Sequence, residues 1–338
     1  AAGLFSIQAI AAWRLGFRFG PLASWRHSGV RQFVHLLLPR TLGQSVTQID
    51  QFVNVPIATR IGPGNLTIFR LANDIQDAPI SIIGVSMATV AFPVFIELLS
   101  QNRRQEFIEH FSKIVRQILF LIIPMTVLLL QLRAQVTRLV GGTHLVSWPS
   151  TITAAQTLGF FALSFFAQSL IPVLARSFYA MKDTKTPVRI TIAAVGLDIV
   201  GSIVLGHLMG VKGLALSFTI SNILNAGALL FVLRQRLGSL DDERMFQSVL
   251  RVMGVTILMA LTVQAAKYFL VTFGLDLSRA VGVLAQAVVA GLVGVLSYMI
   301  FAALFRLEEA SLITQALQAF RQMIVGQRPS NGQDAPTI

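Results

Sequence analysis

The feature that most constrains this chain is a series of eight long apolar runs. They cover residues 33–60, 79–100, 114–139, 152–180, 187–209, 213–233, 249–273 and 280–305. A helix needs about 20 mostly apolar residues to cross a bilayer. Only 12% of the residues are charged, whereas a soluble domain carries about 25%. The sequence therefore predicts an all-α fold, a polytopic transmembrane helix bundle with eight spans.

The segments around these runs predict how the chain is organised. Residues 1–30 resemble the end of a preceding transmembrane helix followed by a basic cytoplasmic linker, so we expect the chain to be part of a longer protein. Residues 31–236 hold six spans, and residues 237–306 hold two more. In residues 307–338, an amphipathic helix of the interfacial type precedes a polar tail that we expect to be disordered.

The positions of the basic residues predict an orientation. Of the 27 Lys and Arg residues, Arg40 and Arg176 fall inside spans and 18 lie on the side of the N-terminal linker. Seven lie on the opposite side: Arg60, Arg70, Arg133, Arg138, Lys212, Lys267 and Arg279. Cytoplasmic loops carry an excess of Lys and Arg. We therefore expect both ends of the chain in the cytoplasm and the protein in the bacterial cytoplasmic (inner) membrane.

Several classes of function are disfavoured by composition and motifs. The net charge of +12 would suggest nucleic acid in a soluble protein, but here the charges flank apolar spans, so we expect membrane lipids or an anionic substrate as partners and no nucleic acid. The chain has no cysteine, and its five histidines lack metal-ligand spacing. No nucleophile elbow or phosphate-binding loop is present. We therefore expect no enzyme activity.

Prolines interrupt the first four apolar runs, at Pro39, Pro56, Pro93, Pro124 and Pro172. Broken helices in a membrane are tolerated where protein or a water-filled cavity satisfies the freed backbone groups. They are common in transporters, in which kinks permit alternating access. A kink that only improves packing would explain any one of these prolines, but four kinked spans in succession favour a transporter-like bundle.

Asp198 is a candidate for ion coupling because a carboxylate in the middle of a span is costly unless it is paired or bound to a cation. Ser202 lies one turn further on the same face. Asn54, Ser217, Thr219 and Asn222 on other spans could add oxygen ligands, so a sodium ion at Asp198 and Asn54, or a proton on Asp198, is one interpretation. The alternative is a hydrogen-bonded Asp that holds helices together. No other cofactor is expected.

The stretch before the second run, residues 62–79, is amphipathic at helical spacing. Ile68, Leu71, Ile75 and Ala78 form an apolar side, and Arg70, Asn73, Asp74 and Asp77 form a polar side. Arg70 and Asp74 are four residues apart and could pair. The polar side is either an ordinary solvated helix face or the lining of a water-filled cavity that meets a polar headgroup.

The stretch 176–188, RSFYAMKDTKTPV, predicts a tight, basic hinge between two spans. Pro187 fits the first turn of a helix, where its missing N–H costs nothing. Asp183, Thr184 or Thr186 could cap that helix. An ordinary charged loop is the alternative.

This hinge stretch, with Tyr179, Asp183, Thr186 and Pro187, resembles the Arg-x-x-Tyr-Ala…Asp-Thr-(Lys/Arg)-Thr-Pro hinge of the MurJ/MviN lipid II flippase family. That family belongs to the same superfamily as the MATE transporters and polysaccharide flippases. The stretches at residues 36–65, 65–93 and 210–238 are similar to helices of the family's second lobe. The resemblance extends from residue 1 to about residue 305, whereas the family has fourteen helices.

The resemblance implies the second lobe of a MATE-like flippase fold plus two appended C-terminal helices that form a lipid-tail groove. It implies translocation of an undecaprenyl-pyrophosphate-linked glycan, the peptidoglycan precursor lipid II, by alternating access. Cavity cations would meet the diphosphate, and this chain offers Arg70, Arg176 and Arg40. The missing N-terminal lobe of the same protein would be a required partner.

One departure from the family concerns Asp74, which aligns with a position where the family usually has an arginine. Arg70, one turn earlier, could restore the positive charge. Two alternatives follow from this departure and from the absent first lobe. One is a flippase for another lipid-linked oligosaccharide or a MATE-like exporter, and the other is a non-transporting scaffold for envelope biogenesis.

Overall fold

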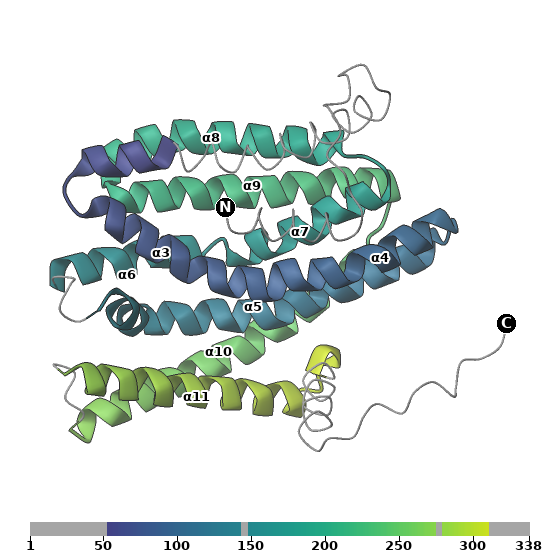
Figure 1. Cartoon of the computed structure of the whole chain (residues 1–338). Helices are drawn as coiled ribbons and strands as arrows, with labels where there is room; N and C mark the ends of the chain where they lie inside the picture. Colours follow the sequence, from purple (N-terminus) through teal and green to yellow (C-terminus); the bar gives the residue numbers. More distant parts are fainter. Residues whose placement is uncertain (1–52, 143–147, 275–278, 311–338) are drawn as a thin grey trace, which may run out of the picture. The chain divides into compact units, whose positions relative to one another are not determined.

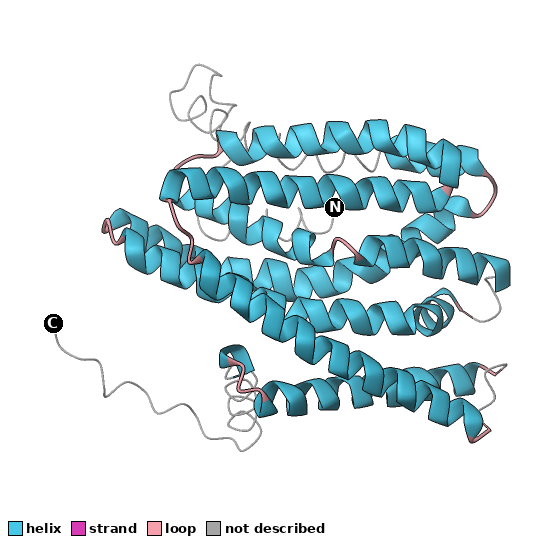
Figure 2. Ribbon diagram, turned by 180° about the vertical axis from the view of Figure 1, so that it is seen from behind, coloured by secondary structure: helices cyan, strands magenta, loops and turns pink. Residues whose placement is uncertain are grey.

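The computed structural model describes residues 53–142, 148–274 and 279–310, which form helices joined by short connections without a β-strand in these ranges (Figures 1 and 2). Six of the described helices are long and apolar enough to cross a membrane, and a bent helix pair makes a seventh candidate span. The all-α transmembrane bundle is therefore confirmed. Of the first predicted span only residues 53–61 are described, and they are helical; Arg40, the linker and the C-terminal amphipathic segment lie outside the described residues. The helices are α3 (Asn65–Pro79), α4 (Ser86–Ser100), α5 (Arg104–Gly141), α6 (Trp148–Ala162), α7 (Phe165–Ala180), α8 (Lys185–Met209), α9 (Val211–Leu237), α10 (Asp242–Thr272) and α11 (Ala280–Leu304).

The second span differs from the prediction because it does not begin at Pro79. Helix α3, the π-helical turn Ile80–Val85 and α4 form one continuous helix over Asn65–Ser100. Pro79 lies inside it and cannot donate a backbone hydrogen bond, and the wider π turn follows directly. At Gly84 a Cβ atom would lie 2.7 Å from the Cα atom of Ser169. The π turn therefore packs directly on the backbone of α7, and only glycine fits at this contact.

The fourth predicted span is broken at Leu163–Ser164, not at Pro172. Helices α6 and α7 meet there at an angle of 43°, while Pro172 lies within α7. The Ser164 hydroxyl donates to the carbonyl of Phe161 at 2.8 Å. Serine side chains compete with the helical backbone in this way, which explains the position of the break.

Helix α5 connects two parts of the described bundle. One side of it packs in the core of α3, α4, α6, α7 and α9, where the rings of Phe95, Phe107 and Phe111 cluster. Another side packs against the pair α10–α11 (Figure 1). There the Tyr298 hydroxyl donates to the carbonyl of Phe120 at 2.7 Å. The pair α10–α11 is therefore anchored on α5.

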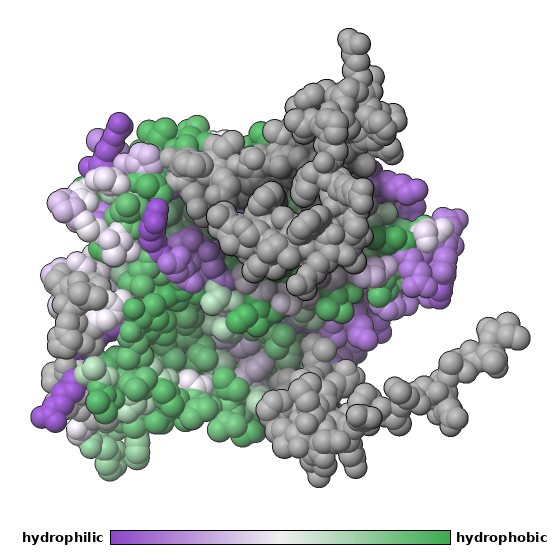
Figure 3. All heavy atoms as spheres, viewed as in Figure 1, coloured by the Kyte–Doolittle hydropathy of each residue, from purple (hydrophilic) through white to green (hydrophobic). Residues whose placement is uncertain are grey.

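The surface has the polarity of a membrane protein. In Figure 3 hydrophobic residues cover the middle of the helices, and hydrophilic residues gather toward the helix ends. A further hydrophilic patch lies over α3. Many large apolar side chains are exposed on α8, α10 and α11, such as Val200, Leu261 and Ile300. Such a surface is stable only in contact with lipid or with another protein.

Candidate functional site

The hinge between α7 and α8 is built around Asp183. Its Oδ1 accepts hydrogen bonds from the backbone N–H groups of Lys185 at 2.9 Å and Thr186 at 3.0 Å, and its Oδ2 accepts one from the Thr186 hydroxyl at 2.6 Å. Asp183 is therefore the residue that caps α8. Pro187 is buried in the first turn of α8, as its fixed φ angle favours. Tyr179 lies partly exposed near the end of α7.

Arg236, near the end of α9, closes this hinge. Its Nη1 lies 2.6 Å from Asp183 Oδ2, its Nη2 donates to the Thr186 hydroxyl at 3.0 Å, and its guanidinium stacks over the ring of Phe178. Arg104, at the start of α5, donates to the carbonyl of Arg236. Burial opposes ionisation of Asp183, but the hydrogen bonds from Thr186 and Arg236 outweigh it and lower the pKa of Asp183 to about 2. This carboxylate is fully paired, and four helices meet around it.

Asp198 lies near the middle of α8 and has a different environment. It is 2% exposed, and its Oδ2 accepts a hydrogen bond from the Asn54 amide at 3.1 Å. The Ser217 hydroxyl on α9 donates to the backbone carbonyl of Asp198 at 2.8 Å. Ser202, one turn along α8, is fully buried. The structure thus brings together the four residues that the sequence suggested for ion coupling.

This cluster has oxygen atoms that the protein itself leaves unsatisfied. Within the described residues, neither Asp198 Oδ1 nor the Ser202 hydroxyl has a hydrogen-bond partner, although both are buried. An unpartnered carboxylate oxygen inside a membrane bundle is costly and fits either a bound cation or a proton. No group of three His, Asp or Glu residues surrounds it in the described part of the chain. The donor set of one carboxylate with neutral oxygens suits a monovalent cation or a proton better than a divalent metal.

Close contact between α8 and α9 holds the cluster together. A Cβ atom at Gly201 would lie 2.4 Å from the Ser217 hydroxyl oxygen, so only glycine leaves space for the hydrogen bond that Ser217 makes to Asp198. Two further oxygens expected in this cluster lie elsewhere. Thr219 donates to the carbonyl of Phe160 on α6, and Asn222 donates to the carbonyl of Phe218 within α9, because both side chains project from other faces of α9.

The polar side of α3 is exposed, as the spacing predicted, but its contacts differ. Arg70 and Asp74 form no ion pair with each other; instead the Asn73 amide donates to Asp77 at 3.2 Å. Ala78 is exposed and Gln76 is buried, the reverse of what their polarity suggests. Gln76 can be buried because both its amide N–H group and its carbonyl oxygen are hydrogen-bonded. With its neighbours it forms a chain of polar side chains that the sequence did not reveal.

This chain crosses from α3 to the break between α6 and α7. Gln76 donates to Asn73 at 2.9 Å and accepts from the Gln168 amide on α7 at 3.1 Å. Gln168 also donates to the Ser164 hydroxyl at 2.8 Å. Hydrophobic periodicity does not predict that a glutamine is buried, because its burial depends on hydrogen-bond partners in other helices. Only tertiary packing could show that these residues meet.

Arg176 is bound to the continuous helix rather than free in a cavity. Its guanidinium donates to the carbonyl of Val85 at 3.2 Å and to the Thr89 hydroxyl at 2.9 Å. Thr89 and Arg70 are 19 residues apart on that helix, about 28 Å at 1.5 Å per residue. Arg70 and Arg176 therefore do not form one anion site, which corrects the grouping suggested by the sequence. Arg40 lies outside the described residues.

The described helices have the fold of a class of membrane transporters of known structure. Three such structures are a lipid II flippase MurJ in an inward closed conformation, an outward-facing MATE family transporter of the MOP superfamily and a Vibrio cholerae MATE transporter. Their TM-scores are 0.66, 0.53 and 0.54, with identities of 22%, 16% and 17%. The likeness covers 81%, 82% and 86% of this chain and 54%, 66% and 68% of theirs.

The sequence identifies the particular family. The family described as lipid II flippase MurJ matches residues 4–283, so the chain belongs to the MurJ family, a family of transporters rather than enzymes. A probable lipid II flippase MurJ of Thermotoga maritima is 28% identical over 77% of this chain and 54% of its own length. A lipid II flippase MurJ of Burkholderia cenocepacia is 27% identical over 64% and 42%. The chain is a multi-pass membrane protein that spans about half the length of the curated relatives it matches.

Proposed function

We propose that this chain takes part in moving lipid II, the undecaprenyl-pyrophosphate-linked peptidoglycan precursor, across the bacterial cytoplasmic membrane by alternating access. Family membership supports this, and one structural observation carries it: a fully buried carboxylate with an unsatisfied oxygen at the contact of α8, α9 and residues 53–61. A site that joins three helices can couple a cation or a proton to their movement. The lobe would work opposite a second lobe, contributed by the same protein or by a partner.

In this mechanism a sodium ion or a proton bound at Asp198 would neutralise the buried charge. Asp198, Asn54, Ser202 and Ser217 would hold it, and its loss would leave an uncompensated charge that favours separation of α8 from its neighbours. Arg70, Asp74 and Arg40 would face the diphosphate headgroup. Arg176 would instead hold α7 against the continuous helix Asn65–Ser100, because both of its hydrogen bonds go to residues of that helix. The hinge end of the bundle and both termini would be cytoplasmic, as the basic residues favour.

The test is complementation of a strain depleted of its flippase. We expect the gene that encodes this chain, in its natural full length, to restore growth, and Asp198→Ala to abolish the rescue while the protein remains in the membrane. Rescue by both Asp198→Ala and Arg176→Ala at normal expression would contradict the assignment of these residues.

A second candidate is transport of a different lipid-linked glycan or of a cationic solute. The observation that favours it is the acidic face of α3, where Asp74 and Asp77 are exposed and Asp74 has no ion pair with Arg70. Transport assays with defined lipids separate these possibilities. If neither lipid II nor another lipid-linked glycan is moved by the full-length protein, a scaffolding role in envelope biogenesis becomes the better explanation.

A further inference from the structure

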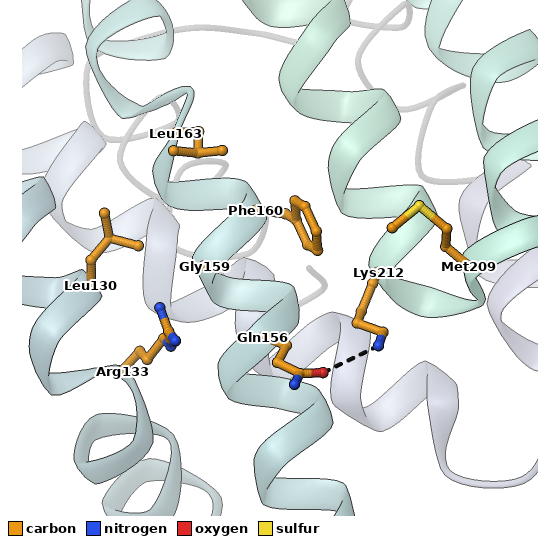
Figure 4. Close-up of a pocket in the computed structure, with 8 residues that line it drawn as sticks. All are labelled: Leu130, Arg133, Gln156, Gly159, Phe160, Leu163, Met209 and Lys212. Carbon is orange, nitrogen blue, oxygen red and sulfur yellow. Dashed lines mark hydrogen bonds between the residues drawn. The ribbon is translucent and has the colours of Figure 1, made fainter.

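A groove of about 470 Å³ lies over α6 (Figure 4). It lies next to the turn between α8 and α9, at the end of the bundle opposite the hinge. Gly159 forms its floor, because this position has no side chain to fill the space. Arg133 of α5 borders one side. Lys212, in the first turn of α9, borders the other side together with Met209, the last residue of α8.

The polar residues of the groove are basic or neutral. Arg133 is exposed and makes no ion pair or hydrogen bond to a described residue, and its side chain rests on Gly159. The Lys212 ammonium donates to the Gln156 amide oxygen at 3.2 Å, a neutral partner. None of the residues that line the groove is acidic. Two cations without a counter-charge on a surface in contact with the membrane favour an anion.

The lining also changes from polar to apolar along the helices. On α5, Leu130 lies about one turn closer to the membrane centre than Arg133. Leu163, directly after the end of α6, lies about two turns closer than Gln156 of α6. Helix α8 ends at Met209, so this level is the edge of the apolar layer. Charge at the edge and apolar surface below it match the headgroup and acyl chain of a lipid that lies against the protein.

We propose that this groove binds an anionic glycerophospholipid of the leaflet at the α8–α9 turn. Its phosphate lies between Arg133 and Lys212, and one acyl chain runs over Gly159 between α5 and α6. This site is separate from the Asp198 cluster and does not depend on the proposed transport function.

The experiment is native mass spectrometry of the full-length protein in detergent, titrated with phosphatidylglycerol or with phosphatidylcholine of the same acyl chains. We expect the protein to prefer phosphatidylglycerol, and Arg133→Gln combined with Lys212→Gln to weaken its binding about 30-fold, about fivefold for each charge. The matched control is Arg60→Gln, which removes an exposed cation at the same end outside the groove and should leave the preference intact.

Two further variants protect this test against misfolding. Gly159→Leu fills the floor without changing charge and should also weaken phosphatidylglycerol binding. The exchange Arg133→Lys with Lys212→Arg keeps both charges and should retain the preference. The proposal is overturned if the double Gln variant or Gly159→Leu binds phosphatidylglycerol like the wild type, if Arg60→Gln is equally impaired, or if inorganic phosphate or undecaprenyl diphosphate displaces the phospholipid at equal concentration.

Discussion

Asp183, just before α8, and Asp198, near the middle of α8, have opposite surroundings. Asp183 lies at the hinge just before α8, and both of its oxygens accept hydrogen bonds, from Lys185, Thr186 and Arg236. Asp198 lies about four turns further along, is buried more deeply, and has one oxygen without a partner in the described residues. The partly buried carboxylate of Asp183 is thus fully satisfied, whereas the more deeply buried one of Asp198 is not.

Selection for stability alone would produce the opposite pattern, with the more deeply buried carboxylate fully hydrogen-bonded. An unpaired polar atom is inexpensive at a surface and costly inside a membrane. A bundle selected only for stability would pair Asp198 or replace it with an apolar residue. We therefore interpret Asp183 as a structural cap that stabilises the hinge. We interpret Asp198 as the group whose unpartnered oxygen serves ion coupling. If the two roles are distinct, substitutions of Asp183 and Asp198 should differ in their effects on stability and on transport.

Replacement of Asp198 is expected to have the largest effect. Asp198→Asn keeps the size of the side chain but removes the charge, so cation affinity and coupled transport should fall about 10- to 100-fold, the range of hydrogen bonds to charged groups. The measurement is transport by the full-length protein in liposomes with and without a sodium or proton gradient. Thermal unfolding should change little. Unchanged transport would show that Asp198 only holds helices together.

Asp183→Asn should show the opposite pattern, a loss of stability with transport retained. The variant weakens the cap of α8 and removes the ion pair with Arg236, so we expect a loss of about 1–2 kcal/mol in the free energy of unfolding. Thermal unfolding in detergent measures this. The control is Asp242→Asn, which removes an exposed ion pair with Arg234 at 2.9 Å and should cost less than about 1 kcal/mol. A strong transport defect in a stable Asp183→Asn protein would blur the distinction between the two aspartates.

A pair of glycines on α8 tests the Asp198 site without touching a charged group. Gly201→Ala would place a Cβ atom 2.4 Å from the Ser217 hydroxyl and force it away from the carbonyl of Asp198. We expect a loss of about 1 kcal/mol in stability and a smaller transport defect than in Asp198→Asn. Gly196→Ala is the matched control, because no atom lies within 4 Å of its added Cβ. It should be neutral or slightly stabilising, and equal behaviour of the two variants would contradict the close α8–α9 contact.

The sequence predicted the bundle and these two aspartates for physical reasons that operate locally. Apolar runs set the spans, and a carboxylate in the middle of one is unusual by itself. Spacing to the next helix offered Asp183, Thr184 or Thr186 as the cap, and the hydrogen bonds of the structure select Asp183. Asn54 and Ser217 were also expected near Asp198, since polar groups in a membrane seek one another.

The sequence could not predict features that depend on packing between distant elements. The continuity of α3 through Pro79 depends on the π turn against Ser169, and the break in the fourth span is at Ser164 and not at Pro172. The side of α9 on which Thr219 lies depends on helix rotation. From the sequence, Arg176 was expected to be a free cation in a cavity, because its partners on the π turn and on α4 were not known. Hinges and helix caps are determined by neighbouring residues in the sequence. The rotation of a helix about its axis and the hydrogen-bond partners of its side chains depend on tertiary packing.

The pH dependence of the stability that Asp183 confers is the smallest expected effect. The pKa of Asp183 is lowered to about 2, below about 3.9 for an unfolded aspartate, so its contribution to stability is fully present above about pH 4 and is lost as the pH falls toward 2. The stability difference between the wild type and Asp183→Asn should therefore be constant from pH 5 to pH 8 and shrink only below about pH 4. Thermal unfolding across this range measures it.

Any pH dependence of transport between pH 5 and pH 8 must then come from a group other than Asp183, and it should disappear in Asp198→Asn if a proton couples at that site. Its persistence in Asp198→Asn would assign the coupling to a different residue.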